Sequence, residues 1–204
     1  MKHPLIPIAA LASLAAFSVH AHGTMQHADG SQMQMQMQMQ SNTQEQLAPP
    51  DIPVTDAAGR TEGFTTRMRN TGPVIVSFMY TNCETVCDIT NGILYGVDQD
   101  LAGQDDRITL VSVAIDPAND TPEALRKTAA EFSASDRWLW LTAGMRGTSP
   151  LLDSLGVAFD SIETHDPMFL VGDFCSGAFT RIIGIPEPKA LIAMARDVPE
   201  CVSS

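Results

Sequence analysis

The chain has 204 residues, of which 44% are hydrophobic, and it carries 24 acidic against 12 basic side chains. This length predicts one domain with extensions, and the hydrophobic fraction is enough for a buried core. The formal net charge of −12 argues against binding to nucleic acid and leaves no basic patch for anionic lipid, while it is compatible with handling cations.

Residues 1–21 have the pattern of a secretory signal peptide. Lys2 and His3 precede an apolar run from Leu5 to Val19, and Val19-His20-Ala21 resembles a cleavage site with small residues. The alternative is an uncleaved anchor, but the run is short for a membrane span, which needs about 20 residues. We therefore expect a periplasmic or secreted protein that touches the membrane only if this segment stays uncleaved. Such a compartment permits disulfides.

Residues 22 to about 50 have the composition of a disordered tail, with few aliphatic residues, many polar ones and a Pro49-Pro50 end. Methionine alternates with glutamine from Met33 to Met39. The candidate metal ligands of the tail are His22, Met25, His27, Met33, Met35, Met37 and Met39. Thioethers suit Cu(I) and imidazole suits either copper ion, which predicts an auxiliary, weak copper site. The alternative is a low-complexity repeat without function.

From residue 51 onward, strands alternate with helices. A turn at Asp56–Gly59 precedes a buried strand over Val74–Tyr80, which leads into Cys83 and Cys87 and a helical pattern that ends near Leu101. The later elements are a strand over 108–115, a helix from Pro122 capped by Thr121, a strand over 138–141, a helix starting at Ser149-Pro150, strands over 168–171 and 179–183, and a helix over 188–196. This order predicts one α/β domain over 51–204, a sandwich with a mixed central sheet flanked by helices.

Cys83 and Cys87 are expected where a buried strand meets a helix. Free N–H groups and the helix dipole at that point favour thiolate, the form that binds metal or attacks a disulfide. On a regular helix, residues four apart have Cβ atoms roughly 5–6 Å apart, whereas a relaxed disulfide needs about 3.8 Å. The spacing therefore favours two metal ligands over a disulfide, and it is one residue longer than the C-x-x-C of thiol oxidoreductases.

His165 is the one histidine of the five that lies in the expected folded region. It precedes the predicted strand over 168–171, a position that commonly lies beside the neighbouring strand-to-helix turn. Two thiolates and an imidazole suit copper, or an open zinc site with water as fourth ligand. The alternative is a histidine that does not touch metal. Pro167 is either a cis-proline of the thioredoxin type or a trans proline that starts a strand.

Three separated segments together resemble the Sco/SenC family of thioredoxin-like copper proteins. They are the run over 78–87 with both cysteines, the run over 111–123, and His165 ahead of Met168-Phe169-Leu170-Val171. The likeness extends over roughly residues 51–197. It implies a thioredoxin-like fold, Cys83, Cys87 and His165 as copper ligands, and a part in maturing the CuA centre of cytochrome oxidase. The implied partner is a client cuproprotein such as cytochrome oxidase subunit II.

The chain also departs from the family pattern. Many members have a proline after each cysteine, where this chain has Glu84 and Asp88, and the Met-rich tail is extra. A second cysteine pair, Cys175 and Cys201, is expected to form a disulfide in an oxidising compartment, although four cysteines allow three connectivities. The alternative is a free Cys175 that acts as an accessory ligand or a resolving thiol.

Three functions remain open from the sequence. The main interpretation is a copper chaperone that transfers its ion by ligand exchange and is not an enzyme. The second is a thiol–disulfide oxidoreductase, in which Cys83 attacks a client disulfide and Cys87 resolves the mixed disulfide. The third is a periplasmic copper buffer that stores the ion in its tail.

Overall fold

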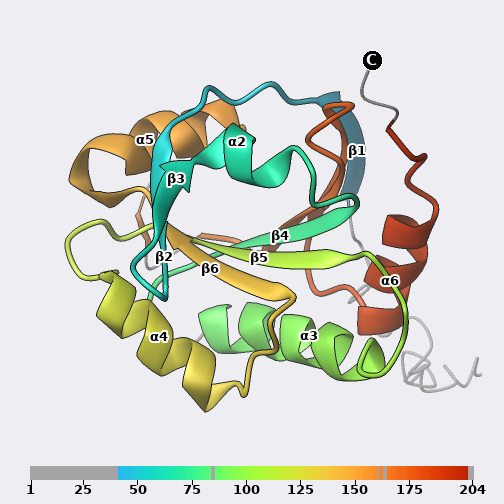
Figure 1. The fold of residues 1–204 in the computed structure, drawn as a ribbon, viewed down its shortest axis with the longest axis horizontal. Helices are drawn as coiled ribbons and strands as arrows, with labels where there is room; N and C mark the ends of the chain where they lie inside the picture. The colour runs from blue at the N-terminus through green and yellow to red at the C-terminus, as the bar shows by residue number, and fades with distance from the viewer. Residues whose placement is uncertain (1–40, 84–85, 160, 163–164, 202–204) are drawn as a thin grey trace, which may run out of the picture.

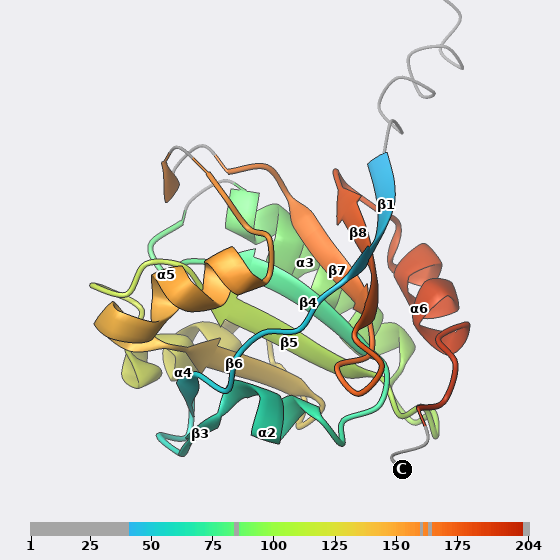
Figure 2. The ribbon, with the colours of Figure 1, turned by 90° about the horizontal axis from the view of Figure 1, so that it is seen from above.

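The computed structural model describes residues 41–83, 86–159, 161–162 and 165–201, which form a mixed sheet covered by helices on both faces (Figure 1). The sheet has eight strands in the order β1-β8-β7-β4-β5-β6-β2-β3 (Figure 2). In chain order the elements are β1 Ser41–Gln46, β2 Pro53–Asp56, β3 Thr61–Gly63, α2 Phe64–Met68, β4 Val74–Met79, α3 Val86–Asp100, β5 Thr109–Ala114, α4 Pro122–Glu131, β6 Trp138–Thr142, α5 Gly144–Ser154, β7 Met168–Gly172, β8 Ala178–Ile183 and α6 Pro188–Arg196.

Strand β4 lies in the middle of the sheet. It pairs in parallel with β5 and antiparallel with β7, and every one of its residues is buried, as its run of apolar residues, interrupted only by Ser77, predicts. One hydrophobic core lies between the sheet and helices α3, α4 and α6, and the other lies between the sheet and helices α2 and α5. The predicted α/β sandwich with a mixed sheet is thereby confirmed.

The local predictions hold for most elements. Thr121 caps α4, since its hydroxyl accepts a hydrogen bond from the Ala124 N–H at 3.2 Å. The predicted start of α5 at Ser149-Pro150 is wrong, because the helix begins at Gly144 and Pro150 lies inside it. The first turns of α5 pack through small residues, and a Cβ placed on Gly147 would lie 2.9 Å from Ile52. Small residues add little to a hydrophobic pattern, so the sequence does not reveal this packing.

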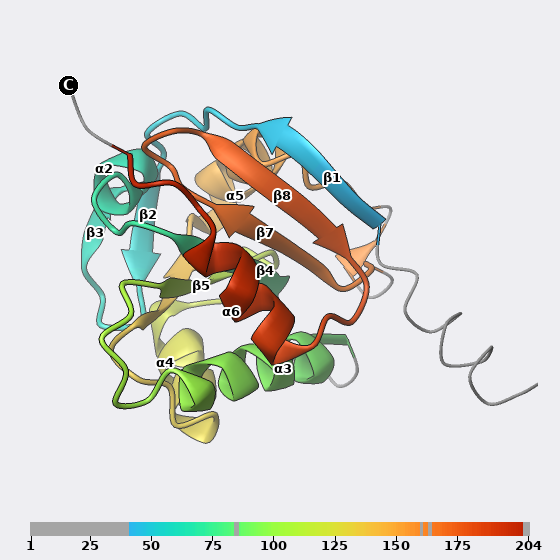
Figure 3. The same ribbon diagram turned by 90° about the vertical axis from the view of Figure 1, so that its right-hand side faces the viewer.

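Strand β1 corrects the expected extent of the tail. The prediction that residues 22 to about 50 do not fold is wrong from residue 41 on, because Ser41–Gln46 pair antiparallel with β8 at the edge of the sheet (Figure 3). Glu45 forms an ion pair with the Arg181 side chain at 2.7 Å, and Leu47 is buried. Main-chain hydrogen bonds and an ion pair hold this polar edge strand, so it needs no alternating apolar pattern. The predicted signal peptide and all seven candidate ligands of the tail lie outside the described residues.

The second cysteine pair ties the C-terminal segment to the hairpin of β7 and β8. Cys175, in the turn of that hairpin, forms a disulfide with Cys201, which follows α6, and their Cα atoms are 6.0 Å apart. None of the helices in the described part of the chain has the length and hydrophobicity that crossing a membrane requires.

Replacing both Cys175 and Cys201 by alanine should lower the free energy of unfolding by about 2–4 kcal/mol, because the bridge closes a long loop in the unfolded chain. Urea denaturation of the oxidised proteins measures this loss. The matched control replaces Cys83 and Cys87 by serine, which opens a much shorter loop and should cost less. Equal denaturation midpoints for the wild-type chain and the Cys175/Cys201 variant would contradict the structural role.

Candidate metal centre

Cys83 and Cys87 lie at the junction between β4 and α3. Cys87 is in the first turn of α3 and is 2% exposed, whereas Cys83 precedes the helix and is half-buried. The two sulfurs are joined in a disulfide, with Cα atoms 5.7 Å apart. The prediction that the spacing favours ligands over a disulfide is therefore wrong. It placed both cysteines on one regular helix, but α3 begins only at Val86 and Cys83 approaches from the preceding loop.

The sulfur atoms are held by main-chain groups. The Cys87 N–H donates to the Cys83 sulfur at 3.1 Å, and the Tyr80 N–H points to the Cys87 sulfur at 3.5 Å. N–H donors directed at a sulfur stabilise negative charge on it, as expected at a helix N-terminus. After reduction, this junction is therefore a favourable place for thiolate.

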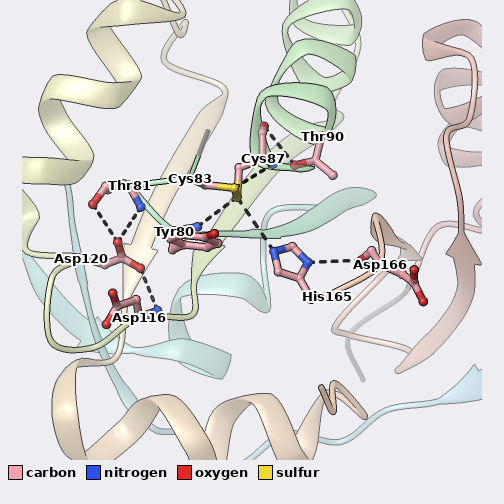
Figure 4. The surroundings of a disulfide bond; sticks show 9 residues. All are labelled: Tyr80, Thr81, Cys83, Cys87, Thr90, Asp116, Asp120, His165 and Asp166. Carbon is pink, nitrogen blue, oxygen red and sulfur yellow. Dashed lines mark hydrogen bonds between the residues drawn. A yellow bond between two sulfur atoms is a disulfide. The ribbon is translucent and has the colours of Figure 1, made fainter. Parts of the chain in front are cut away.

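His165 lies directly beside this pair (Figure 4). Its side chain is 8% exposed, and its Nε2 atom is 3.9 Å from the Cys87 sulfur. Its Nδ1 atom is 3.3 Å from the main-chain carbonyl of Asp166, so a proton on Nδ1 donates to that oxygen and leaves the Nε2 lone pair facing the sulfur. The rings of Tyr80 and Phe159 flank the imidazole, with centroids 6.2 and 6.0 Å away. The structure thus brings Cys83, Cys87 and His165 together.

The peptide bond before Pro167 is trans, so this residue is not a cis-proline of the thioredoxin type. Its carbonyl accepts a hydrogen bond from the Gly184 N–H at 2.9 Å, which ties the histidine loop to the end of β8. The loop that carries His165 is therefore attached to the end of β8, the strand that also pairs with β1.

Asp120 lies in the run over 111–123 and was given no role of its own in the predicted site. Its carboxylate is buried and accepts from the N–H and hydroxyl of Thr81 at 2.7 and 2.9 Å, and from the Asp116 N–H at 2.9 Å. Burial raises the pKa of Asp120, although these hydrogen bonds act in the opposite direction. Asp120 thereby anchors the loop two residues before Cys83. An acidic side chain just before a helix cap is a weak signal, and the likeness of the run over 111–123 to the family assigns no role to this residue.

A second group of potential ligands lies elsewhere. Asp173, Cys175 and Cys201 have ligand atoms within 4.8 Å of one another, but the two sulfurs are joined to each other. Cys175 follows the end of β7, whereas His165 precedes its start, so the two are separated by a strand about 17 Å long. The alternative of Cys175 as an accessory ligand for Cys83 and Cys87 is therefore wrong.

Asp120→Asn should lower the free energy of unfolding by about 1.5–3 kcal/mol, because it weakens charge-assisted hydrogen bonds in a buried position. Urea denaturation measures the change. Asp116→Asn is the matched control, since the Asp116 carboxylate bonds only to Ala118 and Asn119 in its own turn and is not fully buried. A larger loss for Asp116→Asn than for Asp120→Asn would refute the anchoring role.

Comparison with known proteins identifies the family. The SCO1/SenC family model matches residues 40–164, a range that includes both site cysteines and ends one residue before His165. A curated SCO1 protein homolog of Bacillus subtilis (strain 168) is 33% identical over 69 residues. That alignment covers 33% of this chain and 36% of the relative, so the chain spans about a third of the length of the curated relative it matches.

Solved structures show the same fold. Yeast Sco1 with copper bound superposes with a TM-score of 0.62 at 19% identity, over 78% of this chain and 91% of that chain. BsSco, described as having a disulfide switch and as a member of the Sco family of cytochrome c oxidase assembly proteins, superposes with a TM-score of 0.59 at 20% identity, over 74% and 95%. These likenesses show a thioredoxin-like fold. Because the family model covers more than half of the sequence, the protein belongs to the SCO1/SenC family.

Proposed function

We propose that this protein binds copper through Cys83, Cys87 and His165 and delivers it as a metallochaperone. The client is the CuA centre of cytochrome c oxidase, on its subunit II, or another cuproenzyme. One observation carries the proposal, namely the 3.9 Å between His165 Nε2 and the Cys87 sulfur, which is also bonded to Cys83. Two soft sulfurs and an imidazole form a donor set that copper prefers.

The distance between the donors supports this proposal. Sulfur and nitrogen ligands lie about 2.0–2.3 Å from a bound metal ion, so two of them in a trigonal plane are roughly 3.8 Å apart. The observed 3.9 Å is close to that value. The Asp166 carbonyl holds Nδ1, as an outer partner of a ligating histidine does.

Copper binding requires that the Cys83–Cys87 disulfide be opened. A dithiol reductant supplies two electrons and two protons, and the resulting thiols release their protons when they bind the ion. Delivery then proceeds by ligand exchange, in which a cysteine or methionine of the client shares the ion before it leaves. The copper-bound state of yeast Sco1 and the description of BsSco as belonging to a family of oxidase assembly proteins support this function.

We place the protein in the periplasm. The signal-like segment over 1–21 and the Cys175–Cys201 disulfide support an oxidising compartment outside the cytosol.

The alternative function is that of a thiol–disulfide oxidoreductase. The Cys83–Cys87 disulfide supports it, together with the difference in exposure between the two sulfurs. Cys83 is the more accessible one and would attack the client disulfide, while the buried Cys87 would resolve the mixed disulfide. A dithiol reductant first opens the Cys83–Cys87 bond; in the exchange the client gains the two electrons that the reduced pair loses, and the pair closes again as a disulfide.

His165→Ala separates the two functions. Anaerobic Cu(I) titration of the reduced protein against a competing chelator should show at least about 10-fold weaker binding, which is about 1.4 kcal/mol, because one of three ligands is lost. The rate of reduction of a disulfide-containing peptide should change little. Asp166→Asn is the matched control, since Asp166 is exposed and contacts the ring only through its carbonyl. Cys83→Ser should abolish both activities.

Unchanged copper affinity in His165→Ala would overturn the Cys/Cys/His centre and favour the oxidoreductase. Loss of all copper binding on deletion of residues 22–40 would instead favour the copper buffer. The deletion must stop before Ser41, since β1 is part of the sheet.

A further inference from the structure

The first residue of β1 lies near the strand ends at which the candidate metal centre is located. Strands β1, β8 and β7 lie side by side (Figure 2). Ser41 pairs with Ile183 of β8, and Ile183 pairs with Met168 of β7, so the three residues form a row across adjacent strands. Neighbouring strands are about 4.8 Å apart, which puts Ser41 roughly 10 Å from Met168. His165 lies three residues before Met168. Ser41 is therefore at most about 20 Å from His165.

A small cavity lies between this row and the metal centre. Its volume is about 130 Å³, and its lining includes Phe78, Phe159, His165, Met168 and Ile183. Pockets for small-molecule ligands measure about 300–1,000 Å³, so this cavity is too small for one and suits a single side chain. The lining is mainly apolar, but His165 contributes a metal ligand. An unbranched, flexible methionine fills such an irregular apolar space well.

The segment just before Ser41 carries Met33, Met35, Met37 and Met39. An extended chain covers at most about 3.3–3.6 Å per residue, so Met35 and Met33 reach about 20 and 27 Å from Ser41. These chain lengths are enough to span the distance from Ser41 to the cavity and the centre. The main-chain pairing of β1 and the Glu45–Arg181 ion pair fix the point from which this segment leaves the domain.

We propose that the segment over 33–39 is a copper-uptake arm for the centre formed by Cys83, Cys87 and His165. Its thioethers take up Cu(I), one methionine side chain docks in the cavity beside His165, and the ion passes to the two cysteine sulfurs and the imidazole. The inference rests on the proposed copper function. It adds how the ion reaches the centre.

The transfer balances without any further reactant once a dithiol has reduced the disulfide. The ion stays Cu(I) throughout, the thioethers are neutral before and after, and the two thiols release two protons to solvent. Thiolates bind Cu(I) more strongly than thioethers do, which sets the direction of transfer. Attachment to β1 keeps the arm at a high effective concentration near the centre, so that transfer is intramolecular.

The test compares the chain from residue 22 onward with a variant in which Met33, Met35, Met37 and Met39 are all replaced by leucine. Leucine keeps the side chains apolar and of similar size but removes the sulfur. The reduced proteins receive Cu(I) from a weak chelator, and copper arrival is followed as protection of Cys83 and Cys87 from alkylation, read by mass spectrometry. The matched control is Met145→Leu, which removes the sulfur of an exposed methionine outside the arm.

If the arm supplies the ion, Cu(I) should protect Cys83 and Cys87 from alkylation about 10-fold or more slowly in the quadruple leucine variant. The equilibrium Cu(I) affinity of the centre and the rate of protection in Met145→Leu should stay near the wild-type values. A wild-type rate in the quadruple variant overturns this inference alone, since a tight site sensitive to His165→Ala keeps the proposed function. If the wild-type chain has no tight Cu(I) site, both the uptake arm and the proposed copper function are overturned.

Docking in the cavity has its own measurement. In a Cys83→Ser, Cys87→Ser chain, which retains the arm, Cu(I) should shift the methyl NMR signals of Met168 and Ile183. The same chain with the four leucines should show no such shift. Equal shifts in both chains would mean that something other than the arm occupies the cavity, and they would overturn the docking step.

Discussion

The pairing of β4 with its two neighbours is the constraint on which the rest of the site depends. β4 runs antiparallel to β7, so the end of β4, which leads to Cys83, lies beside the start of β7, which follows His165. β4 runs parallel to β5, so the loop that follows β5 and carries Asp120 begins beside the C-terminal end of β4. One buried strand therefore collects the two sulfurs, the imidazole and the carboxylate that anchors the cysteine loop (Figure 4).

The site combines two chemical states in one place. Cys83 lies outside the regular helix, so the pair closes into a disulfide, and the same two sulfurs lie next to a buried imidazole. Oxidised, the pair offers no thiolate to a metal. Reduced, it offers two, next to N–H groups that stabilise them. The proposed copper binding therefore depends on the redox state of this pair, which connects the two proposed functions, chaperone and oxidoreductase.

The two ends of β7 are used differently. At its end, the hairpin to β8 carries Cys175, whose bond to Cys201 fastens the segment after α6. At its start, Met168 and Ile183 border the cavity beside His165 and continue the row to Ser41. The disulfide links the segment after α6 to one end of β7, while β1 begins beside the other end of β7, where the candidate metal centre lies.

The sequence by itself determined the elements whose signal is local. The apolar run of β4, the cap of α4 by Thr121 and the span of α6 all followed from patterns within a few residues. Tertiary structure alone decided the rest. Strand β1 has no apolar pattern and is held by hydrogen bonds to β8 and the Glu45–Arg181 pair. The early turns of α5, which the hydrophobic pattern misses, pack closely on Ile52 at Gly147. Cys87 and His165 are 78 residues apart, and only the order of the strands brings them within 3.9 Å.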